Sequence, residues 1–279
     1  MKPPKFDMAR PQDLDEALRL LAADPDSKLI AGGQSLVPVM NFRLAAPSLL
    51  IDLNQISGLV GIRHTDGMLR IGAMTRQQRL LESPLVHEHA PLLGKALSNI
   101  GHVQTRSRGT IGGSLAHADP SAELPLVMVT LDAMISVRSD GGGRTVPARA
   151  FFTDAMTTDL ASDEIVTEIA VPCAPPGTRT VFKEMVRRHG DFAIVAVAAQ
   201  SVEGRLAVAV GGLEASPRLC TQVMDECHGG APGRSRLASA IRAELADALP
   251  LGDLQADGEY RRHLAAVLME DVLGEVFAS

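Results

Sequence analysis

The first fifty residues carry a hydrophobic pattern typical of a small α/β unit. Apolar side chains recur at helical spacing from residue 14 to residue 21, and Asp13 stands where a helix N-cap is expected. Two short apolar runs, residues 28–31 and 49–53, have the length and composition of strands. We therefore predict one helix followed by two strands, with the unit ending at residue 56.

Residues 57–175 alternate between strand-like and helix-like patterns. The segment 58–72 alternates around Asp66-Gly67, a dipeptide typical of a tight hairpin turn. The other elements expected here are a helix capped by Thr75 and running through Leu81, a helix over 91–100 and a strand over 164–171. This pattern indicates a second unit that mixes a sheet with short helices.

The pattern of apolar and polar residues changes again after Pro175-Pro176-Gly177, a tripeptide that marks a boundary. The third unit is therefore expected to span residues 176–279. It is expected to contain three β-rich segments followed by two amphipathic helices, over 180–186, 192–202, 206–213, 234–249 and 258–277. The fold class predicted for the whole chain is therefore α+β, in three successive units.

Composition and charge narrow the classes of protein to which the chain can belong. Hydrophobic residues make up 46% of its 279 residues, which is ample for real cores. The net charge of -6 and the pI near 5.8 argue against nucleic-acid binding, which needs a basic surface. The first residues lack an apolar signal core, and the apolar runs are too short to span a bilayer. We expect a cytoplasmic protein with no membrane span and no nucleic-acid partner.

The three cysteines, Cys173, Cys220 and Cys227, are an odd number and form no C-x-x-C pair. This spacing supports neither a disulfide framework nor a zinc or iron–sulfur site made by cysteines of this chain. It fits a reducing cytosol.

Two glycine pairs stand in the same sequence context, an apolar run followed by polar donors. The first lies in residues 29–36 and the second in residues 110–114, within the polar stretch 106–125. Glycine lets a backbone turn and approach a ligand closely, and such turns point successive N–H groups at an anion. Two such turns indicate one diphosphate between them. The candidate binding residues are Leu29, Ile30, Ala31, Gly32, Gly33, Gln34, Ser35, Leu36, Thr110, Ile111, Gly112, Gly113 and Ser114.

Other kinds of chemistry are poorly supported at these segments. Neither glycine pair belongs to a GxxxxGK[ST] phosphate loop or a GxGxxG dinucleotide fingerprint. His117, Asp119 and Glu123 are awkwardly spaced as metal ligands, and no second cluster completes a shell. Ser114 lacks a nucleophile-elbow motif, which disfavours a hydrolase. We therefore predict no metal ligands and no acid–base or nucleophilic residue.

A third polar stretch, residues 183–191, reads KEMVRRHGD and is flanked by Phe182 and Phe192. It is compatible with an ordinary solvated surface. Its place at the start of a unit also suits a loop that covers an aromatic ring, with Lys183 tuning the electronics of that ring.

Five motifs run nearly from end to end of the chain. They are FxxxRPxxLxEALxLL at 6–21, AGGQSLVPVM at 31–40, LIDLNQI at 50–56, RGTIGGSLAHADPSAELP at 108–125 and FKEMVRRHGDFAIV at 182–195. Together they resemble the flavin-binding (medium) subunit of the molybdenum hydroxylases, the family of xanthine dehydrogenase, aldehyde oxidase and aerobic carbon monoxide dehydrogenase. Ser107 stands where the family commonly has Asn.

The resemblance implies a two-lobed FAD-binding domain of the PCMH type, formed by residues 1–56 and 57–175. A C-terminal α/β flavoprotein domain would follow over 176–279. The two glycine turns would hold the FAD diphosphate. Further contacts implied by the family are Ile100 near the adenine, Glu123 accepting from cofactor hydroxyls, and Val166 and Lys183 near the isoalloxazine.

The resemblance also implies a redox subunit of a heteromeric enzyme. A large molybdopterin-binding subunit would hydroxylate the substrate, a small [2Fe-2S] subunit would relay electrons, and FAD on this chain would pass them to NAD, quinone or oxygen. Two alternatives stay open: a stand-alone flavin oxidoreductase of the same fold, and a scaffold that has lost its flavin. We expect valine at Gly33 or Gly113 to abolish FAD retention and to leave the fold largely intact.

Overall fold

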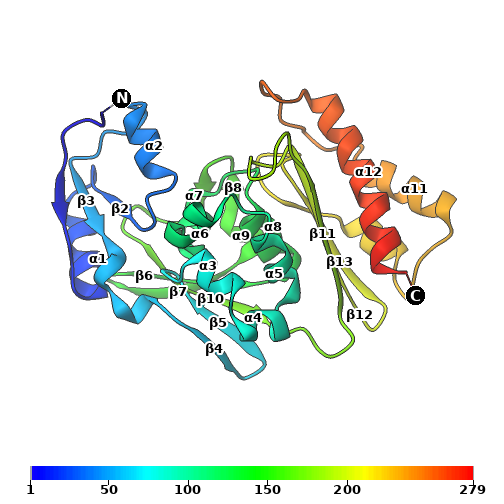
Figure 1. Ribbon diagram of the computed structural model, residues 1–279, viewed down its shortest axis with the longest axis horizontal. Coiled ribbons are helices and arrows are strands. Elements are labelled where there is room, and N and C mark those ends of the chain that lie inside the picture. The colour runs from blue at the N-terminus through cyan, green and yellow to red at the C-terminus, as the bar shows by residue number, and fades with distance from the viewer. Residues whose placement is uncertain (1, 279) are drawn as a thin grey trace.

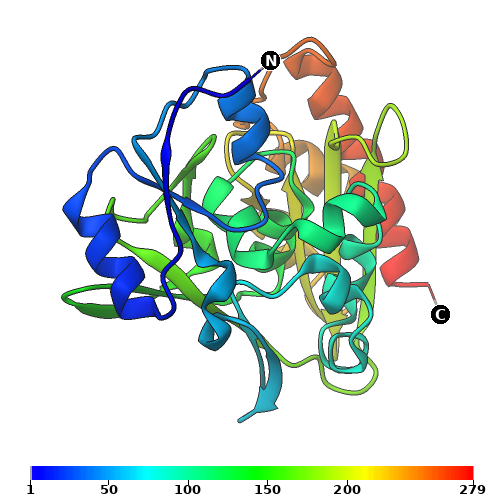
Figure 2. The same ribbon diagram turned by 60° about the vertical axis from the view of Figure 1, so that its left-hand side comes forward.

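The computed structural model describes residues 2–278, and three successive units lie side by side in it (Figure 1). Each unit is built on its own sheet, and the second unit lies between the other two. Figure 2 shows the N-terminal unit coming forward, with its second helix above the helices of the middle unit.

The first unit is a three-stranded parallel sheet with β3 in its centre. Its elements are β1 (Asp7–Ala9), α1 (Leu14–Ala23), β2 (Lys28–Ile30), α2 (Leu36–Asn41), β3 (Leu49–Asp52) and the short 3-10 turns η1 (Leu53–Gln55) and η2 (Ser57–Leu59). Asp13 caps α1 as predicted, because its carboxylate accepts from the N–H of Glu16 at 2.8 Å. Ala17, Leu18 and Leu21 form the buried face of that helix. The sheet is thus covered by α1 on one side, and β2 runs directly into the first glycine turn.

The second unit is a five-stranded antiparallel sheet in the order β4-β5-β10-β6-β7. Its sheet strands are β4 (Ile62–Thr65), β5 (Met68–Gly72), β6 (Met134–Ser139), β7 (Gly142–Pro147) and β10 (Ile165–Pro172). Its helices and small strands are α3 (Gln77–Leu81), α4 (Pro84–His89), α5 (Pro91–Leu97), α6 (Val103–Arg108), α7 (Ile111–His117), α8 (Glu123–Thr130), α9 (Ala148–Phe151), β8 (Phe152–Asp154) and β9 (Thr157–Thr158). The predicted hairpin at Asp66-Gly67 is present between β4 and β5.

The third unit is a four-stranded antiparallel sheet with both faces covered. Its elements are β11 (Arg179–Met185), β12 (Val195–Val202), β13 (Arg205–Gly211), β14 (Arg218–Leu219), α10 (Thr221–Glu226), α11 (Arg234–Glu244) and α12 (Gly258–Val276). Along β12, Val195 and Val197 pack into the core under the unit's own helices, whereas Ala196 and Ala198 belong to the core of the second unit. Small side chains on that face allow the helices of the second unit to approach the sheet closely.

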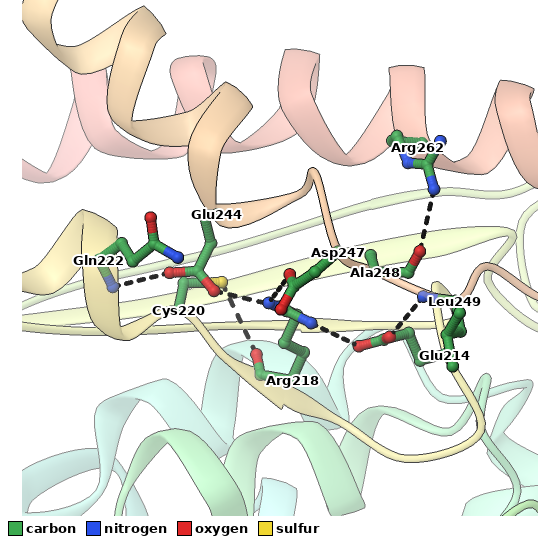
Figure 3. A network of polar contacts seen from close by, with 9 residues as sticks. All are labelled: Glu214, Arg218, Cys220, Gln222, Glu244, Asp247, Ala248, Leu249 and Arg262. Atoms are coloured by element: carbon green, nitrogen blue, oxygen red, sulfur yellow. Dashed lines mark hydrogen bonds and ion pairs between the residues drawn. The ribbon is translucent and has the colours of Figure 1, made fainter.

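A polar network centred on Arg218 fastens the helical layer of the third unit to the end of its sheet (Figure 3). Arg218 donates to Glu244 of α11 at 3.1 Å, to Glu214 at 3.2 Å and to Asp247 at 2.6 Å. Glu244 is only 2% exposed and also accepts from the N–H of Gln222 at 2.7 Å. The buried carboxylate is therefore paired and hydrogen-bonded, as a buried charge requires.

Several elements differ from the sequence prediction. Thr75 does not cap a helix: its hydroxyl bonds to the backbone of Gly61, and α3 begins two residues later. Residues 110 and 111 begin a helix that was not predicted, because Thr110 is the N-cap of α7 and Ile111 is its first residue. The helix predicted over 234–249 ends at Glu244.

The three larger sheets occupy residues 7–52, 62–172 and 179–219, on either side of the boundaries predicted from the sequence. The core of the first unit also includes Met74 and Ile165, which belong to the second. The boundaries at 56 and 175 therefore stay a prediction. Across residues 2–278 no helix combines the length and the apolar character needed to cross a bilayer.

Candidate functional site

The first glycine turn presents a row of free backbone donors between β2 and α2. Within the described chain, the N–H groups of residues 32–36 donate to no other protein group. Gly33 adopts a φ of 72°, a left-handed conformation that favours glycine and bends the row. Successive backbone N–H groups that lack partners form an anion-binding concavity. The turn is therefore built to hold an anionic group from outside the chain.

A cavity of about 560 Å³ opens over this turn. That volume lies within the range of small-molecule sites. It is lined by Met8, Arg10, Ile30, Ala31, Gly32, Gly33, Gln34, Val37, Pro38, Asp52, Asn54 and Arg108. Arg108 comes from the second unit, so the cavity lies where two units meet. Its two arginines supply positive charge to an anionic ligand.

The second glycine turn lies directly against the first. A Cβ on Gly32 would meet the carbonyl of Arg108 and would lie 2.8 Å from the Cα of Gly109. A Cβ on Gly113 would lie 3.4 Å from the Cβ of Ala31. At residue 32 only glycine allows the two backbones to approach this closely. The prediction that segments 29–36 and 110–114 converge on one place is supported by these contacts.

Two polar side chains bridge the turns. Asn54 donates to the carbonyl of Ala31 at 2.9 Å, and Arg76 donates both to the Asn54 side chain and to the carbonyl of Arg108. Partial burial lowers the pKa of Arg76, and the neighbouring Arg108 charge lowers it further. Arg76 therefore links the two segments, directly at Arg108 and through Asn54 at Ala31.

The expectation of free N–H groups is wrong for most of the second turn. The N–H groups of Ile111 and Gly112 donate to the carbonyls of Thr75 and Ala73, at 3.1 and 2.8 Å. The N–H of Gly113 donates to the Thr110 hydroxyl, and that of Ser114 to the Thr110 carbonyl, both at 3.1 Å. The bonds to Thr110 are those of an ordinary capped helix start. The bonds to Thr75 and Ala73 anchor that helix to the chain that follows β5.

The donors left at the second turn are fewer and different in kind. The backbone N–H of Thr110 has no partner among residues 2–278, although the residue is only 2% exposed. A buried N–H without a partner is rare and points to a ligand. The hydroxyl of Ser114, in the first turn of the partly buried helix α7, is a second donor. This segment therefore offers two donors, whereas the sequence predicted a turn with several successive free N–H groups.

Glu123 is the first residue of α8 and is 5% exposed. Burial raises its pKa to about 8; its own backbone N–H opposes this, and the charges of Glu184 and Asp119 add to it. Burial also raises the pKa of Glu184, on β11, to about 7, and its Oε2 has no hydrogen-bond partner. These two carboxyl groups come from different units, and the charge of Glu184 contributes to the raised pKa of Glu123.

Ile100 and Val166 are buried apolar residues of the second unit's core. Arg106 donates to the carbonyls of Ile100 at 2.8 Å and Gly101 at 3.2 Å, which fixes the chain between α5 and α6. Gly190, in the loop 186–194 of the third unit, packs against the ring of His102. The polar stretch that begins at Lys183 thus reaches the segment that carries Ile100.

The structure does not bring Lys183 together with these residues. Its ammonium pairs with Asp271 at 2.7 Å and Glu275 at 2.9 Å, both on α12. Those hydrogen bonds raise its pKa. Side chains alternate along β11, so Val181 and Lys183 face the helices of the third unit, whereas Phe182 packs on the core of the second. A contact between Lys183 and a flavin stays a prediction from family resemblance.

The family of the chain follows from comparison with known proteins. Residues 4–174 match the family described as FAD binding domain in molybdopterin dehydrogenase. Residues 180–276 match the family described as CO dehydrogenase flavoprotein C-terminal domain. The chain belongs to the FAD-binding medium subunits of the molybdenum hydroxylases. It is therefore an oxidoreductase subunit whose cofactor is FAD.

Individual relatives of this medium subunit cover its whole length. The 6-hydroxypseudooxynicotine dehydrogenase complex subunit alpha of Paenarthrobacter nicotinovorans is 37% identical over 99% of this chain and 95% of its own. The nicotine 6-hydroxylase medium subunit of the same organism is 37% identical over 100% and 99%. The carbon monoxide dehydrogenase structure from Hydrogenophaga pseudoflava, which lacks the Mo-pyranopterin moiety of its molybdenum cofactor, superposes with a TM-score of 0.95. That structure is 34% identical and covers 99% of this chain and 98% of the matched chain.

The residues of the medium subunit's first turn fit the diphosphate of FAD. Its unpaired N–H groups, the cavity above them and the cations Arg10 and Arg108 are what a dianionic group needs. Asn54 and Arg76, which bridge the turns, were missed by sequence reasoning as site residues. Asn54 closes the LIDLN run, which was a usable signal, but nothing in the sequence singled out Arg76.

Proposed function

We propose that this chain is the FAD-carrying electron-transfer subunit of a heteromeric molybdenum hydroxylase. Electrons would come from iron–sulfur clusters on a small partner and leave for an external acceptor. The observation that carries the proposal is the row of unpaired N–H groups at residues 32–36, closed off by the second unit at Gly109. Relatives named as medium subunits or as subunits of a dehydrogenase complex support the heteromeric assembly.

Within the proposal, the chain's residues have binding and positioning roles. The N–H groups of residues 32–36, with Arg10 and Arg108, would hold the diphosphate, helped by the hydroxyls of Ser35 and Ser114. Ile100 and Val166 would contribute apolar packing around the ring systems, and Glu123 would accept from cofactor hydroxyls. The remaining residues of this proposed set are Leu29, Ile30, Ala31, Gln34, Leu36, Thr110, Ile111, Gly112 and Lys183.

Bound FAD supplies the redox chemistry, because it accepts electrons singly and releases a pair to the final acceptor. The protein contributes binding, orientation and exclusion of water. A protonated Glu123 can donate a hydrogen bond, whereas an ionised one only accepts. Because its pKa is raised to about 8, Glu123 changes between these two states near neutral pH. No residue of the chain is assigned as a general acid or base.

The first experiment is to purify the chain, record its flavin absorbance and release the cofactor by denaturation. We expect one FAD per chain. A colourless chain that takes up no added FAD would contradict the proposal and would favour the flavin-free scaffold. Steady-state oxidation of an organic substrate by the chain alone would favour a stand-alone oxidoreductase.

The second experiment addresses the partners. Purification of the native assembly under mild conditions should yield molybdenum and [2Fe-2S] clusters in stoichiometric amounts, on chains other than this one. Reduction of its flavin with dithionite, followed by mixing with NAD, a quinone or oxygen, identifies the acceptor by the fastest reoxidation. An assembly without molybdenum or iron would refute the proposed electron path and leave FAD binding intact.

A further inference from the structure

Three metal-ligating side chains meet at one end of the second unit, in a place the flavin site does not use. They are His64 on β4, His89 at the end of α4 and Cys173 just after β10. One potential ligand atom from each lies within 4.8 Å of the other two. Among residues 2–278, this is the one such group of three or more His, Cys, Asp or Glu side chains. The elements β4 and α4 lie at the lower edge of the molecule in Figure 1, away from α2.

Backbone hydrogen bonds fasten the three ligand-bearing segments to one another. The N–H of Cys173 donates to the carbonyl of Gly67, in the tip of the β4–β5 hairpin, at 2.9 Å. The next N–H, that of Ala174, donates to the carbonyl of His89 at 2.7 Å. His64 lies on the same hairpin, paired with Leu69 across the strands. The three ligands are therefore held near one another by main-chain contacts, before any ion is considered.

The side chains already occupy positions that a small ion could bridge. The ring centroids of His64 and His89 are 4.0 Å apart, with an angle of 35° between the ring planes. The Cys173 side chain is partly buried, whereas Cys220 and Cys227 are buried completely. Glu88 lies alongside, with its Oε1 3.8 Å from the Nε2 of His89. Two imidazoles, a thiol and an adjacent carboxylate thus gather from three separate segments.

We propose that His64, His89 and Cys173 form a zinc-binding site. Nitrogen and sulfur ligands select a borderline-soft divalent ion over calcium or magnesium, which prefer oxygen. Glu88 or a water molecule would occupy the fourth tetrahedral position. Binding would convert the Cys173 thiol to a zinc thiolate and release its proton to solvent.

The consequence of such a site is structural. Cys173 is six residues before β11, in the connection that leads from the second unit to the third. A zinc ion on Cys173 would tie that connection to α4 and to the β4–β5 hairpin. The proposal does not rest on the electron-transfer function, because no residue of this site lines the cavity over the first glycine turn.

The test uses the full-length chain and the metal alone. Titration with Co²⁺ as a zinc substitute should give a thiolate-to-cobalt charge-transfer band that saturates at one ion per chain. Zn²⁺ added in excess should remove the band. The band should be absent in Cys173→Ser, and zinc affinity should fall at least about 10-fold in His64→Ala and in His89→Ala. His87→Ala removes an exposed histidine from the same helix and is the matched control, with no expected effect.

A second measurement needs no variant and is insensitive to misfolding of mutants. Cys173 is the only partly exposed cysteine of the described chain, so a thiol reagent should modify one cysteine in the native protein. Stoichiometric Zn²⁺ should protect that thiol. A Cys173 that reacts equally fast with and without Zn²⁺, or a cobalt band that persists in Cys173→Ser, would overturn the proposal.

Discussion

Gly32 is the residue at which the two halves of the proposed flavin site touch. A Cβ there would meet the Arg108 carbonyl and the Cα of Gly109, both of which are backbone atoms and cannot rotate away. We predict that Gly32→Ala pushes the first and second units apart and lowers retained FAD to less than about a tenth of the wild-type content. Flavin absorbance per chain after gel filtration measures this.

The matched control for Gly32→Ala is Gly58→Ala, because an added Cβ at residue 58 meets no atom within 4 Å. Equal flavin content in Gly32→Ala and Gly58→Ala would contradict the contact between the turns. Gly113 is a poorer test than the sequence indicated. A Cβ at Gly113 would lie 2.8 Å from the hydroxyl of Thr110, which caps α7, so valine there also disturbs the protein itself.

Glu123 makes stability depend on pH. Because its folded pKa, about 8, lies above the ordinary value of 4.5, the folded state binds its proton more tightly than the unfolded state does. The free energy of unfolding therefore falls as the pH rises from the unfolded pKa to the folded one. We predict that Glu123→Gln removes part of this decline and stabilises the chain by a few kcal/mol at pH 8, with little change at pH 4.

Denaturant unfolding of wild type and Glu123→Gln between pH 4 and pH 8 measures this difference. Glu82→Gln makes the same chemical change at an exposed position and is the control. Parallel stability profiles for wild type and Glu123→Gln would show that the carboxyl group is not desolvated as the structure indicates.

At the scale of residues, the sequence predicted that the two glycine segments lie together and missed how their backbone groups are used. Glycine pairs followed by hydroxyls do mark both turns. Whether an N–H is free depends on its partner, and the partners of Ile111 and Gly112 are carbonyls of residues 75 and 73, distant in sequence. The proposed zinc ligands His64, His89 and Cys173 were also missed. They lie far apart in the sequence, so no local spacing of ligand residues connects them.

At the scale of elements, the short helix α11 depends on the Arg218 network. Without the guanidinium, Glu244 would remain buried and lose its cation. Breaking a buried pair in this way costs about 3–5 kcal/mol. We predict that Arg218→Met lowers the local stability of α10 and α11 by about that amount, with faster amide hydrogen exchange confined to the third unit.

Arg149→Met is the control for the Arg218 prediction, because Arg149 and its partner Asp132 are both exposed at a distance of 3.9 Å. Such surface pairs contribute less than about 1 kcal/mol. Hydrogen exchange in α11 that is as slow in Arg218→Met as in Arg149→Met would show that the network is not stabilising.

Among the elements, those with long or strongly periodic patterns were predicted well, including α1, the β4–β5 hairpin and α12. The short helices that border the site were not. Helices α2, α6 and α7 have six or seven residues each, too few for a periodic signal, and α7 begins with a β-branched residue and two glycines. Tertiary anchoring of α7, through the N–H groups that bond to residues 73 and 75, overrides its weak helix propensity.

At the scale of the whole molecule, the middle unit contacts both neighbours. It closes the cavity over the first glycine turn at Arg108, and its helices cover the alanine-rich face of the third unit's sheet. The order of the units along the chain was readable from the sequence. The sequence did not show which faces of the units meet. Ala196 and Ala198 have the pattern of buried strand residues, and only the structure shows that they pack on the second unit.

The central claim is that the N–H groups of residues 32–36 hold the diphosphate of FAD at the contact between the first two units. An experimental density map of the flavin-loaded chain tests it most directly. We predict the diphosphate oxygens within about 2.7–3.2 Å of those backbone nitrogens, with Arg108 beside them. A diphosphate found elsewhere, with these nitrogens bonded only to water, would contradict the account.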